Sequence, residues 1–401
     1  MLRRPAVVLA LWLLFCPAAS AAGPQATVSS LERHMRSVGG ASGALVVDLD
    51  TGEELLSVRP GTRRVPASVQ KLYTTSAALL DYGPSAQLTT TVLAEAPLLP
   101  DGVLEGDIYL KGGGDPTLGK PGLEALARQL AAAGLIEVQG RVVGDESYFD
   151  TRRGPPSSHF RTSAYVGPLS ALALDHGRTG RPRPWWQARP AAFAATAFAK
   201  ALRRQGINVR SRGRTGIAPA FAVEVGRYLS PKMAQIAKLT NAPSDNYMAE
   251  TLIKGLGARF GEGGTTSGGA HVVRTAALQH FGVRPRVADG SGLSRSNRTS
   301  PREVMTLLRE LYVHELEGAF RSSLAVAGRT GTLEDRMRKS AARGRCQGKT
   351  GTLISVSALA GYCETRGGAT VAFAFLMNRV SPYRARTVQD RMLDAIARYA
   401  S

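Results

Sequence analysis

The sequence predicts a mixed α/β fold of the α+β type, in which one antiparallel sheet flanked by helices takes strands from both ends of the chain. Two apolar runs near the start, residues 44–49 and 54–58, flank an Asp-Thr-Gly turn and are typical of a strand pair. Further strand patterns lie near the other end, at residues 347–353, 357–363 and 369–378. Strands at both ends with helices between them indicate one sheet that joins the two termini.

Helical patterns occupy most of the chain between these strands. The first begins at Ala67, next to Pro66, and closes at Gly83-Pro84, which are ordinary start and stop signals. The other helices are expected at residues 123–133, 231–238, 245–260, 269–281, 301–316 and 387–399. The helices from residue 231 to residue 316 would cover one sheet.

The pattern of apolar and polar residues changes between residues 87 and 227. Short alternating runs such as LTTTVLAEA and VLEGDIYLKG, with the turn signal GGGDPTL, predict an inserted, smaller, β-rich domain. We therefore expect a discontinuous domain made of residues 22–86 and 228–401, interrupted by residues 87–227. A chain of 401 residues is long enough for two or three domains.

Residues 1–21 have the pattern of a signal peptide. Arg3 and Arg4 precede ten apolar residues, and Ala19-Ser20-Ala21 matches a cleavage site. Ten apolar residues are too few to span a bilayer, which needs roughly 20. No later apolar stretch is long enough either, so we expect an exported protein, periplasmic or extracellular, without a transmembrane anchor. The alternative is a buried N-terminal helix.

The chain is basic, with 51 Lys and Arg against 31 Asp and Glu. Ten basic residues and no acidic residue lie between His176 and Ile217, which indicates a solvated face or contact with an anionic wall polymer. Trp185 and Trp186 lie in the same stretch, where a core position is favoured over a sugar-stacking platform. No nucleic-acid motif, metal-ligand spacing or phosphate loop is present, so no nucleic-acid partner, metal or cofactor is expected.

Three short motifs carry the chemistry, and each occurs once, in this order: Ser68-Val69-Gln70-Lys71, Ser244-Asp245-Asn246 and Lys349-Thr350-Gly351. They are the S-x-x-K, S-D-N and K-T-G set of penicillin-recognising serine enzymes. A serine hydroxyl needs a base beside it to become a nucleophile. Residues three apart share a helix face, so Lys71 can reach Ser68, and a buried lysine near another cation can act as that base.

The remaining motif residues suit the other steps of acyl transfer. Ser244 can pass a proton to a leaving amine, Asn246 can hold both Lys71 and a substrate peptide group, and Lys349 can bind a carboxylate. The N–H groups of Ser68 and Thr352 could form an oxyanion hole. Taken singly, each motif also fits a helix start, a turn or a strand end. The three together, in order, favour catalysis.

Around these motifs the sequence resembles the D-alanyl-D-alanine carboxypeptidase/endopeptidase family, the class C low-molecular-mass penicillin-binding proteins. The segments that carry the resemblance run from about residue 40 to residue 378: PASVQK, GGGDPTL, GDESYFD, VGPLSALALD, NAPSDNYMAE, DGSGLSRSN, AGRTGTL and GKTGTLISVSALAGY. The resemblance implies a β-lactamase/transpeptidase-like domain that cleaves D-Ala-D-Ala in peptidoglycan stem peptides and D-Ala-diaminopimelate cross-links. β-Lactams would then be covalent inhibitors.

The resemblance also assigns roles to particular residues. Ser68 is similar to the acylated nucleophile, Lys71 to its base, and Ser244 and Asn246 to the residues that relay the proton and position substrate. Lys349, Thr350 and Gly351, followed by Thr352, resemble the strand that holds the terminal carboxylate. Asp145, Phe149 and Arg295 resemble residues that recognise the free end of a diaminopimelate side chain, although each also has an ordinary structural explanation.

The two cysteines outside the leader, Cys346 and Cys363, are expected to form a disulfide in an oxidising compartment. If Lys349 and Ala360 pair across a hairpin centred near Ile354, then Cys346 and Cys363 also face each other. The disulfide would then stabilise the strand that carries K-T-G.

Two other functions remain open. A serine β-lactamase would use the same acylation groups, but no Glu-x-x-x-Asn element typical of class A lies between Ser244 and Lys349. A wall-binding protein without turnover would use the basic insertion alone. The sequence does not give the oligomeric state or the balance of carboxypeptidase and endopeptidase activity.

Overall fold

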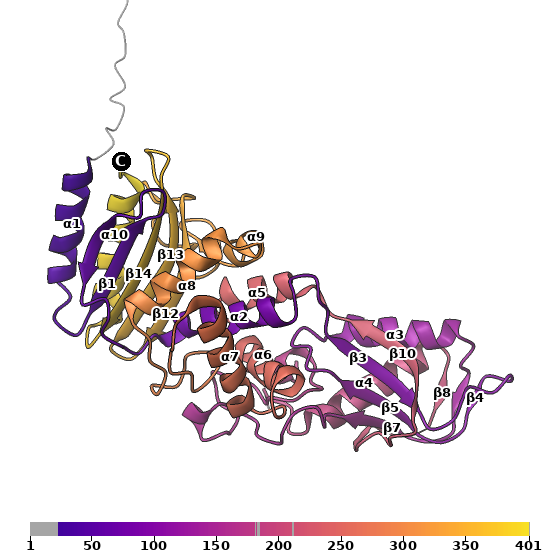
Figure 1. Ribbon diagram of the computed structural model, residues 1–401. Coiled ribbons are helices and arrows are strands. Elements are labelled where there is room, and N and C mark those ends of the chain that lie inside the picture. Colours follow the sequence, from indigo (N-terminus) through magenta and orange to yellow (C-terminus); the bar gives the residue numbers. More distant parts are fainter. Residues whose placement is uncertain (1–22, 181, 183–184, 211, 401) are drawn as a thin grey trace, which may run out of the picture.

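The computed structural model describes residues 23–180, 182, 185–210 and 212–400 (Figure 1). The predicted leader, residues 1–21, lies outside the described residues. A six-stranded sheet occupies one end of the molecule, and two smaller sheets occupy the other end, with helices α2, α5, α6 and α7 between them. No helix among the described residues has the length and apolar character needed to cross a membrane.

The six-stranded sheet joins the two ends of the chain, as expected. Its order is β11-β12-β13-β14-β1-β2, and every neighbouring pair is antiparallel. The predicted fold class is confirmed. The strand bounds are β1 Gly43–Asp48, β2 Glu54–Val58, β11 Ala325–Val326, β12 Cys346–Leu353, β13 Val356–Glu364 and β14 Thr370–Asn378.

Helices cover both faces of this sheet, because alternate strand residues point to opposite sides. Leu45 and Val47 of β1 face the core formed with α2, α7 and α8, whereas Ala44 and Val46 face the core formed with α1 and α10. We call this sheet with its helices the catalytic body. Its helices are α1 Pro24–Arg36, α2 Gln70–Asp81, α5 Met233–Asn241, α6 Asn246–Phe260, α7 Thr266–Phe281, α8 Pro301–Val313, α9 Glu317–Arg321 and α10 Pro382–Ala397.

The insertion forms its own sheets and its own apolar core. A five-stranded sheet has the order β10-β3-β5-β7-β9, and a three-stranded sheet has the order β4-β6-β8. We call this part, with α3 Lys120–Ala132 and α4 Pro190–Arg204, the inserted body. Its strands are β3 Thr89–Ala94, β4 Val103–Leu104, β5 Ile108–Gly112, β6 Glu137–Val138, β7 Val142–Asp145, β8 Asn208–Val209, β9 Arg214–Thr215 and β10 Val223–Leu229. The domain limits at residues 87 and 227 remain a prediction close to the ends of β3 and β10.

Strands β12 and β13 pair in the register expected from the sequence. Lys349 lies opposite Ala360 and Cys346 lies opposite Cys363. The two cysteines form a disulfide between these neighbouring strands. The bond therefore joins the strand that carries Lys349, Thr350 and Gly351 to the next strand of the sheet.

Two local expectations from the sequence are wrong. The helix expected at residues 301–316 ends at Val313, and the short helix α9 follows from Glu317. Trp185 is 56% exposed rather than part of the core. Its position just beyond the packed helices of the inserted body leaves the ring at the surface, which residue type alone does not reveal.

Candidate active site

Ser68 lies in a tight turn at the start of α2, and the surrounding backbone is packed closely enough to require glycine. The preceding residue, Ala67, has a left-handed φ of 48°. A Cβ on Gly351 would lie 2.7 Å from the carbonyl oxygen of Pro66 and 3.0 Å from the nitrogen of Ser68. Gly292 has a φ of 86°, and a Cβ there would meet the carbonyl of Ala67 at 1.9 Å. Backbone strain and close approach are therefore concentrated around Ser68.

Lys71, one helical turn after Ser68, points to the same place. Its Nζ donates to Ser68 Oγ at 3.1 Å, to Asn246 Oδ1 at 2.8 Å and to the carbonyl of Ser291 at 2.7 Å. Asn246 and Ser291 are far from Lys71 in the sequence, whereas Ser68 is three residues before it. The structure therefore brings the S-x-x-K and S-D-N motifs into direct contact through one ammonium group.

The surroundings of Lys71 favour loss of its proton. The side chain is fully buried, and burial lowers its pKa to about 8. The carboxyl groups of Glu250, Asp289 and Asp245 act in the opposite direction and raise the pKa. Because burial is the larger effect, more of Lys71 is unprotonated near neutral pH than of an exposed lysine, and only the unprotonated amine can accept a proton.

Lys349 is also fully buried. Its Nζ donates to the carbonyl of Thr350 at 2.8 Å. Burial, with the charge of Lys71, holds its pKa well below the usual value. The described contacts do not place Lys349 among the residues that line the cleft, whereas Thr350 does line it.

The Ser244-Asp245-Asn246 segment turns sharply into α6. Ser244 adopts a left-handed φ of 64°, and Asp245 caps the helix by accepting the N–H of Met248 at 2.8 Å. Asn246 presents its oxygen to Lys71 and donates through Nδ2 to the carbonyl of Tyr165 at 3.3 Å. One amide thus joins Lys71 to the segment that carries Tyr165.

The edge of β12 faces the cleft with free backbone groups. Strand β11 pairs with β12 only at Gln347 and Gly348, so among the described strands the outer edge from Lys349 to Leu353 has no partner. The hydroxyl of Thr350 lies 2.7 Å from that of Thr332, and Arg386 donates to the hydroxyl of Thr352 at 3.0 Å. An extended peptide with a terminal carboxylate fits such an edge.

These groups share one cleft of about 890 Å³. Its lining includes Ser68, Ser244, Asn246, Thr350 and Thr352, as the three motifs predicted. The other lining residues are Ser157, Ser158, Ser163, Tyr165, Leu293, Arg295, Thr332, Asp335, Arg336, Leu353, Ile354 and Arg386. Chemically, the cleft offers a nucleophile, an adjacent base and hydroxyl and guanidinium groups for an anion.

The three residues expected to recognise diaminopimelate do not lie together in the structure. Arg295 lines the cleft, where its guanidinium donates to the carbonyl of Ile354. Asp145 is fully buried and accepts the backbone N–H groups of Ser147 at 2.8 Å and Ala218 at 3.0 Å. Phe149 is buried next to Gly114 and Gly264, with its ring 5.9 Å from Lys254 Nζ of α6. Neither Asp145 nor Phe149 is among the cleft residues, because each fills a structural position.

Glu250 and Asp289 are buried near Lys71, and the sequence reasoning missed both. Glu250 Oε1 accepts the N–H of Ser291 at 2.8 Å, and the carbonyl of Ser291 in turn accepts Lys71. Burial and the neighbouring Asp289 raise the pKa of Glu250 to about 8, and burial raises the pKa of Asp289. Glu250 lies one helical turn after Asn246, so their shared helix face was the available signal.

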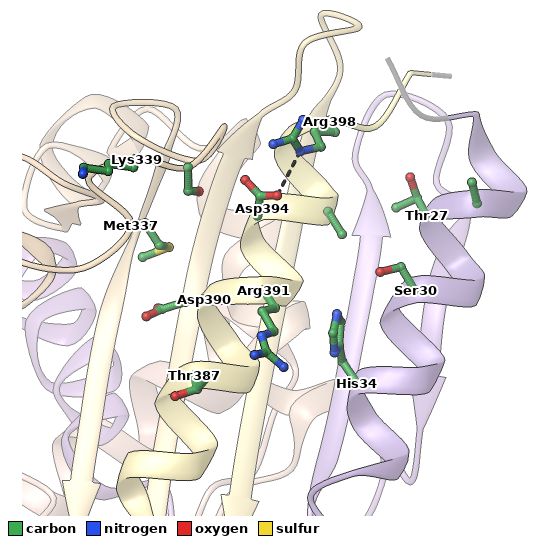
Figure 2. A pocket seen from close by; sticks show the side chains of 13 residues that line it. Thr27, Ser30, His34, Met337, Lys339, Thr387, Asp390, Arg391, Asp394 and Arg398 are labelled. Atoms are coloured by element: carbon green, nitrogen blue, oxygen red, sulfur yellow. Dashed lines mark hydrogen bonds and ion pairs between the residues drawn. The ribbon is translucent and has the colours of Figure 1, made fainter. Parts of the chain in front are cut away.

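A separate groove of about 690 Å³ lies between α1 and α10 (Figure 2). Arg398 pairs there with Asp394 at 2.9 Å, and His34 and Arg391 lie between the two helices. Lys339 and Ser340 line this groove, but the described hydrogen bonds join no lysine to a serine hydroxyl there, whereas Lys71 donates to Ser68 in the cleft. Among the described residues there is also no cluster of three His, Cys, Asp or Glu side chains that could hold a metal ion.

The fold is that of known penicillin-binding proteins. Penicillin-binding protein 4 from Haemophilus influenzae superposes with a TM-score of 0.77 at 21% sequence identity, covering 90% of this chain and 97% of that one. A predatory endopeptidase from Bdellovibrio bacteriovorus superposes with a TM-score of 0.58 at 17% identity, covering 88% and 90%. These likenesses show that the chain shares the fold of penicillin-binding protein 4.

Sequence comparison identifies the family. The model of the D-Ala-D-Ala carboxypeptidase 3 (S13) family matches residues 25–182 and 179–399. A D-alanyl-D-alanine carboxypeptidase from Actinomadura sp. is 31% identical over 90% of this chain and 82% of its own length. Carboxypeptidase DacB from Mycolicibacterium smegmatis is 31% identical over 86% and 78%. The chain belongs to the S13 family of D-Ala-D-Ala carboxypeptidases.

Proposed function

We propose that this carboxypeptidase works through a covalent acyl-enzyme on Ser68 and is acylated by penicillins at the same residue. The observation that carries the proposal is the position of Lys71, whose Nζ contacts both Ser68 Oγ and Asn246 Oδ1 while burial lowers its pKa to about 8. A serine beside a base of this kind is the arrangement that nucleophilic catalysis requires.

In acylation, Ser68 Oγ attacks the carbonyl carbon between the two D-Ala residues and transfers its proton to Lys71 Nζ. The negative charge that develops on the carbonyl oxygen is stabilised by the N–H groups of Ser68 and Thr352. The proton reaches the leaving amine through Ser244, and free D-Ala departs. Water then attacks the ester, and Ser68 recovers its proton.

Substrate is held along the unpaired edge of β12. Thr350 and Thr352 receive the terminal carboxylate, with Arg386 beside Thr352 supplying positive charge. Lys349 is buried on the same strand. Asn246 holds the peptide group of the stem on the other side of Ser68.

We extend the proposal to cleavage of D-Ala-diaminopimelate cross-links. A cross-link leaves a carboxylate at the end of a side chain, and Arg295 is a cation in the cleft that can receive it. A fold neighbour from Bdellovibrio bacteriovorus carries the name predatory endopeptidase. Export by way of residues 1–21 would bring the enzyme to the cell wall, where these substrates are.

The test is intact-mass analysis after incubation with benzylpenicillin, beside Ser68→Ala as the matched variant. A lasting adduct of one drug mass, absent from Ser68→Ala, is the expected result, followed by release of D-Ala from a stem pentapeptide. No adduct on folded protein would contradict the acyl-enzyme. An adduct that disappears within minutes while the drug is destroyed would instead favour a β-lactamase.

A further inference from the structure

A second groove, of about 630 Å³, lies on the inserted body, outside the catalytic cleft. It is bounded by the start of α3, the outer face of α4 and part of the segment from Leu174 to Arg189. Four lysine and arginine residues line it, and the one carboxylate among its lining residues, Glu124, already pairs with Arg204. Asp175 is the nearest other acid at the start of α3, next to Gly119.

The cations follow one face of α4. Arg189, Phe193, Lys200 and Arg204 are separated by four, seven and four residues, so they lie in a single stripe along the helix. Arg189 lies just before α4 and Arg204 is its last residue, so the two are about 22 Å apart along the axis at ~1.5 Å per residue. Positive charge spread over such a length suits an extended anionic chain better than a small anion.

Aromatic rings and an unused acceptor lie in the same groove. Trp186 and Phe193 are lining residues, and Trp185 is exposed next to them. Gln187 is buried, and its Nε2 donates to the carbonyls of Leu174 and Arg178. Its Oε1 has no hydrogen-bond partner among the residues that the structure describes. An unpaired buried acceptor is costly unless a ligand satisfies it, and hydroxyl or amide N–H groups on a sugar are suitable donors.

The groove is connected to the catalytic cleft by one segment of chain. Ser163 and Tyr165 line the cleft, whereas Trp186 and Gln187 line the groove. Between them, the ring of His176 stacks on Tyr247 at 5.0 Å, and its Nδ1 lies 3.5 Å from Asp245. The segment is thus fixed to the start of α6, beside Asn246.

We propose that the α4 groove is a binding site for the glycan strand of peptidoglycan, which holds the polymer while a stem peptide occupies the catalytic cleft. The proposal rests on the proposed function for the identity of the polymer. Peptidoglycan offers pyranose rings that stack on tryptophan, N-acetyl and hydroxyl donors for Gln187, and stem-peptide carboxylates for the cationic stripe. An anionic membrane would satisfy the charges, but a concave groove with a buried acceptor fits a sugar better than a lipid surface.

The first experiment measures retention of the protein on purified, insoluble sacculi. The double variant Arg189→Ala with Lys200→Ala removes two groove cations for which the structure shows no ion pair. The matched control, Lys238→Ala with Arg309→Ala, removes two exposed cations of the catalytic body and the same net charge. We expect the groove variant to bind sacculi about fivefold more weakly, and the control to bind like the wild type.

Three results would overturn the proposal: unchanged binding by the groove variant, equal loss by the control variant, or binding to anionic phospholipid vesicles without binding to sacculi. Acylation by benzylpenicillin, measured on the same samples, separates the two proposals. The groove variant should be acylated at the wild-type rate, because a small β-lactam needs only the cleft. If neither the wild type nor any variant is acylated, but the groove variant alone loses binding to sacculi, the acyl-enzyme proposal is contradicted. The proposal of a glycan site in the groove is then still supported.

Tryptophan fluorescence gives a direct reading from the groove. The sequence contains three tryptophans, Trp12, Trp185 and Trp186, so protein without residues 1–21 reports from Trp185 and Trp186 alone. Titration with soluble muropeptide oligomers should shift or quench this emission in the wild type and in Ser68→Ala equally. An unchanged spectrum at concentrations that saturate sacculi binding would contradict contact at Trp186.

Discussion

The titratable groups next to Ser68 in the catalytic body are buried, whereas the cations of the groove on the inserted body are exposed. Next to Ser68, four titratable groups are fully buried: Lys71, Lys349, Glu250 and Asp289 are each 0% exposed. In the inserted body, Arg189 just before α4 and Lys200 and Arg204 near its end are exposed. Buried charges lose their hydration, so their proton affinities shift and they suit catalysis. Exposed charges stay hydrated and suit the capture of a large anionic polymer.

The sharpest test of this contrast is the replacement of the buried base. We expect Lys71→Ala to slow acylation by benzylpenicillin about 10³-fold, because Ser68 loses the group that accepts its proton. The rate of adduct formation, followed by intact mass, measures this effect. Lys254→Met is the matched control, since Lys254 is also buried but donates to Asp150 and to the carbonyl of Arg152. If acylation slows as much in Lys254→Met as in Lys71→Ala, the loss of any buried lysine is enough to slow acylation, and contact with Ser68 is not the cause.

The pH dependence of acylation separates a buried base from an exposed charge. Below its pKa, Lys71 carries a proton and has no lone pair for Ser68. With a pKa of about 8, the second-order rate of acylation should rise about tenfold per pH unit below pH 7 and level off above pH 8. Stopped-time mass measurements from pH 5.5 to 9.5 give the profile. A flat profile over this range would contradict Lys71 as the base.

A smaller effect is expected at Glu250, which acts through a neighbour. Glu250→Ala leaves the N–H of Ser291 without its acceptor and loosens the carbonyl that holds Lys71. We expect acylation about tenfold slower and a loss of roughly 1–3 kcal/mol in unfolding free energy. Glu250→Gln keeps an acceptor oxygen and should restore most of the acylation rate. If Gln is as damaging as Ala, the charge of Glu250 matters rather than its hydrogen bond.

The smallest effect on acylation is expected at the disulfide. Cys346→Ala with Cys363→Ala should lower the unfolding free energy by about 2–3 kcal/mol, as expected for a closed loop of this size. The benzylpenicillin rate should stay close to that of the wild type, because hydrogen bonds between β12 and β13 still hold the strand. Denaturant unfolding and acylation on the same sample test both statements. A large loss of acylation in the folded double variant would show that β12 depends on the covalent bond for its position.

Some features of the fold and the site followed from local sequence. The turn and strand pair at residues 44–58, the helix after Ser68 and the register of β12 with β13 depend on neighbouring residues and on the period of each element. The pairing of Ser68 with Lys71 needed only the three-residue spacing of one helical turn. These contacts are short-range, so periodicity and spacing are sufficient to predict them.

Other features could not be read from local patterns. Asp145 stands in a segment that resembles a recognition site, yet both of its oxygens accept backbone N–H groups in the inserted body. Trp185 has the composition of a core residue and lies at the surface. In each case the position of a side chain depends on which distant segment packs beside it.

The sequence by itself therefore predicted the class of chemistry, because the order and spacing of three motifs indicate a nucleophile, a base and an anion-binding strand. Only the tertiary structure decided how that chemistry is tuned. It brings Asn246 and the carbonyl of Ser291 to Lys71 across 175 and 220 residues, and it buries the ammonium group between them. Desolvation depends on everything packed around a group, and a one-dimensional pattern does not contain that information.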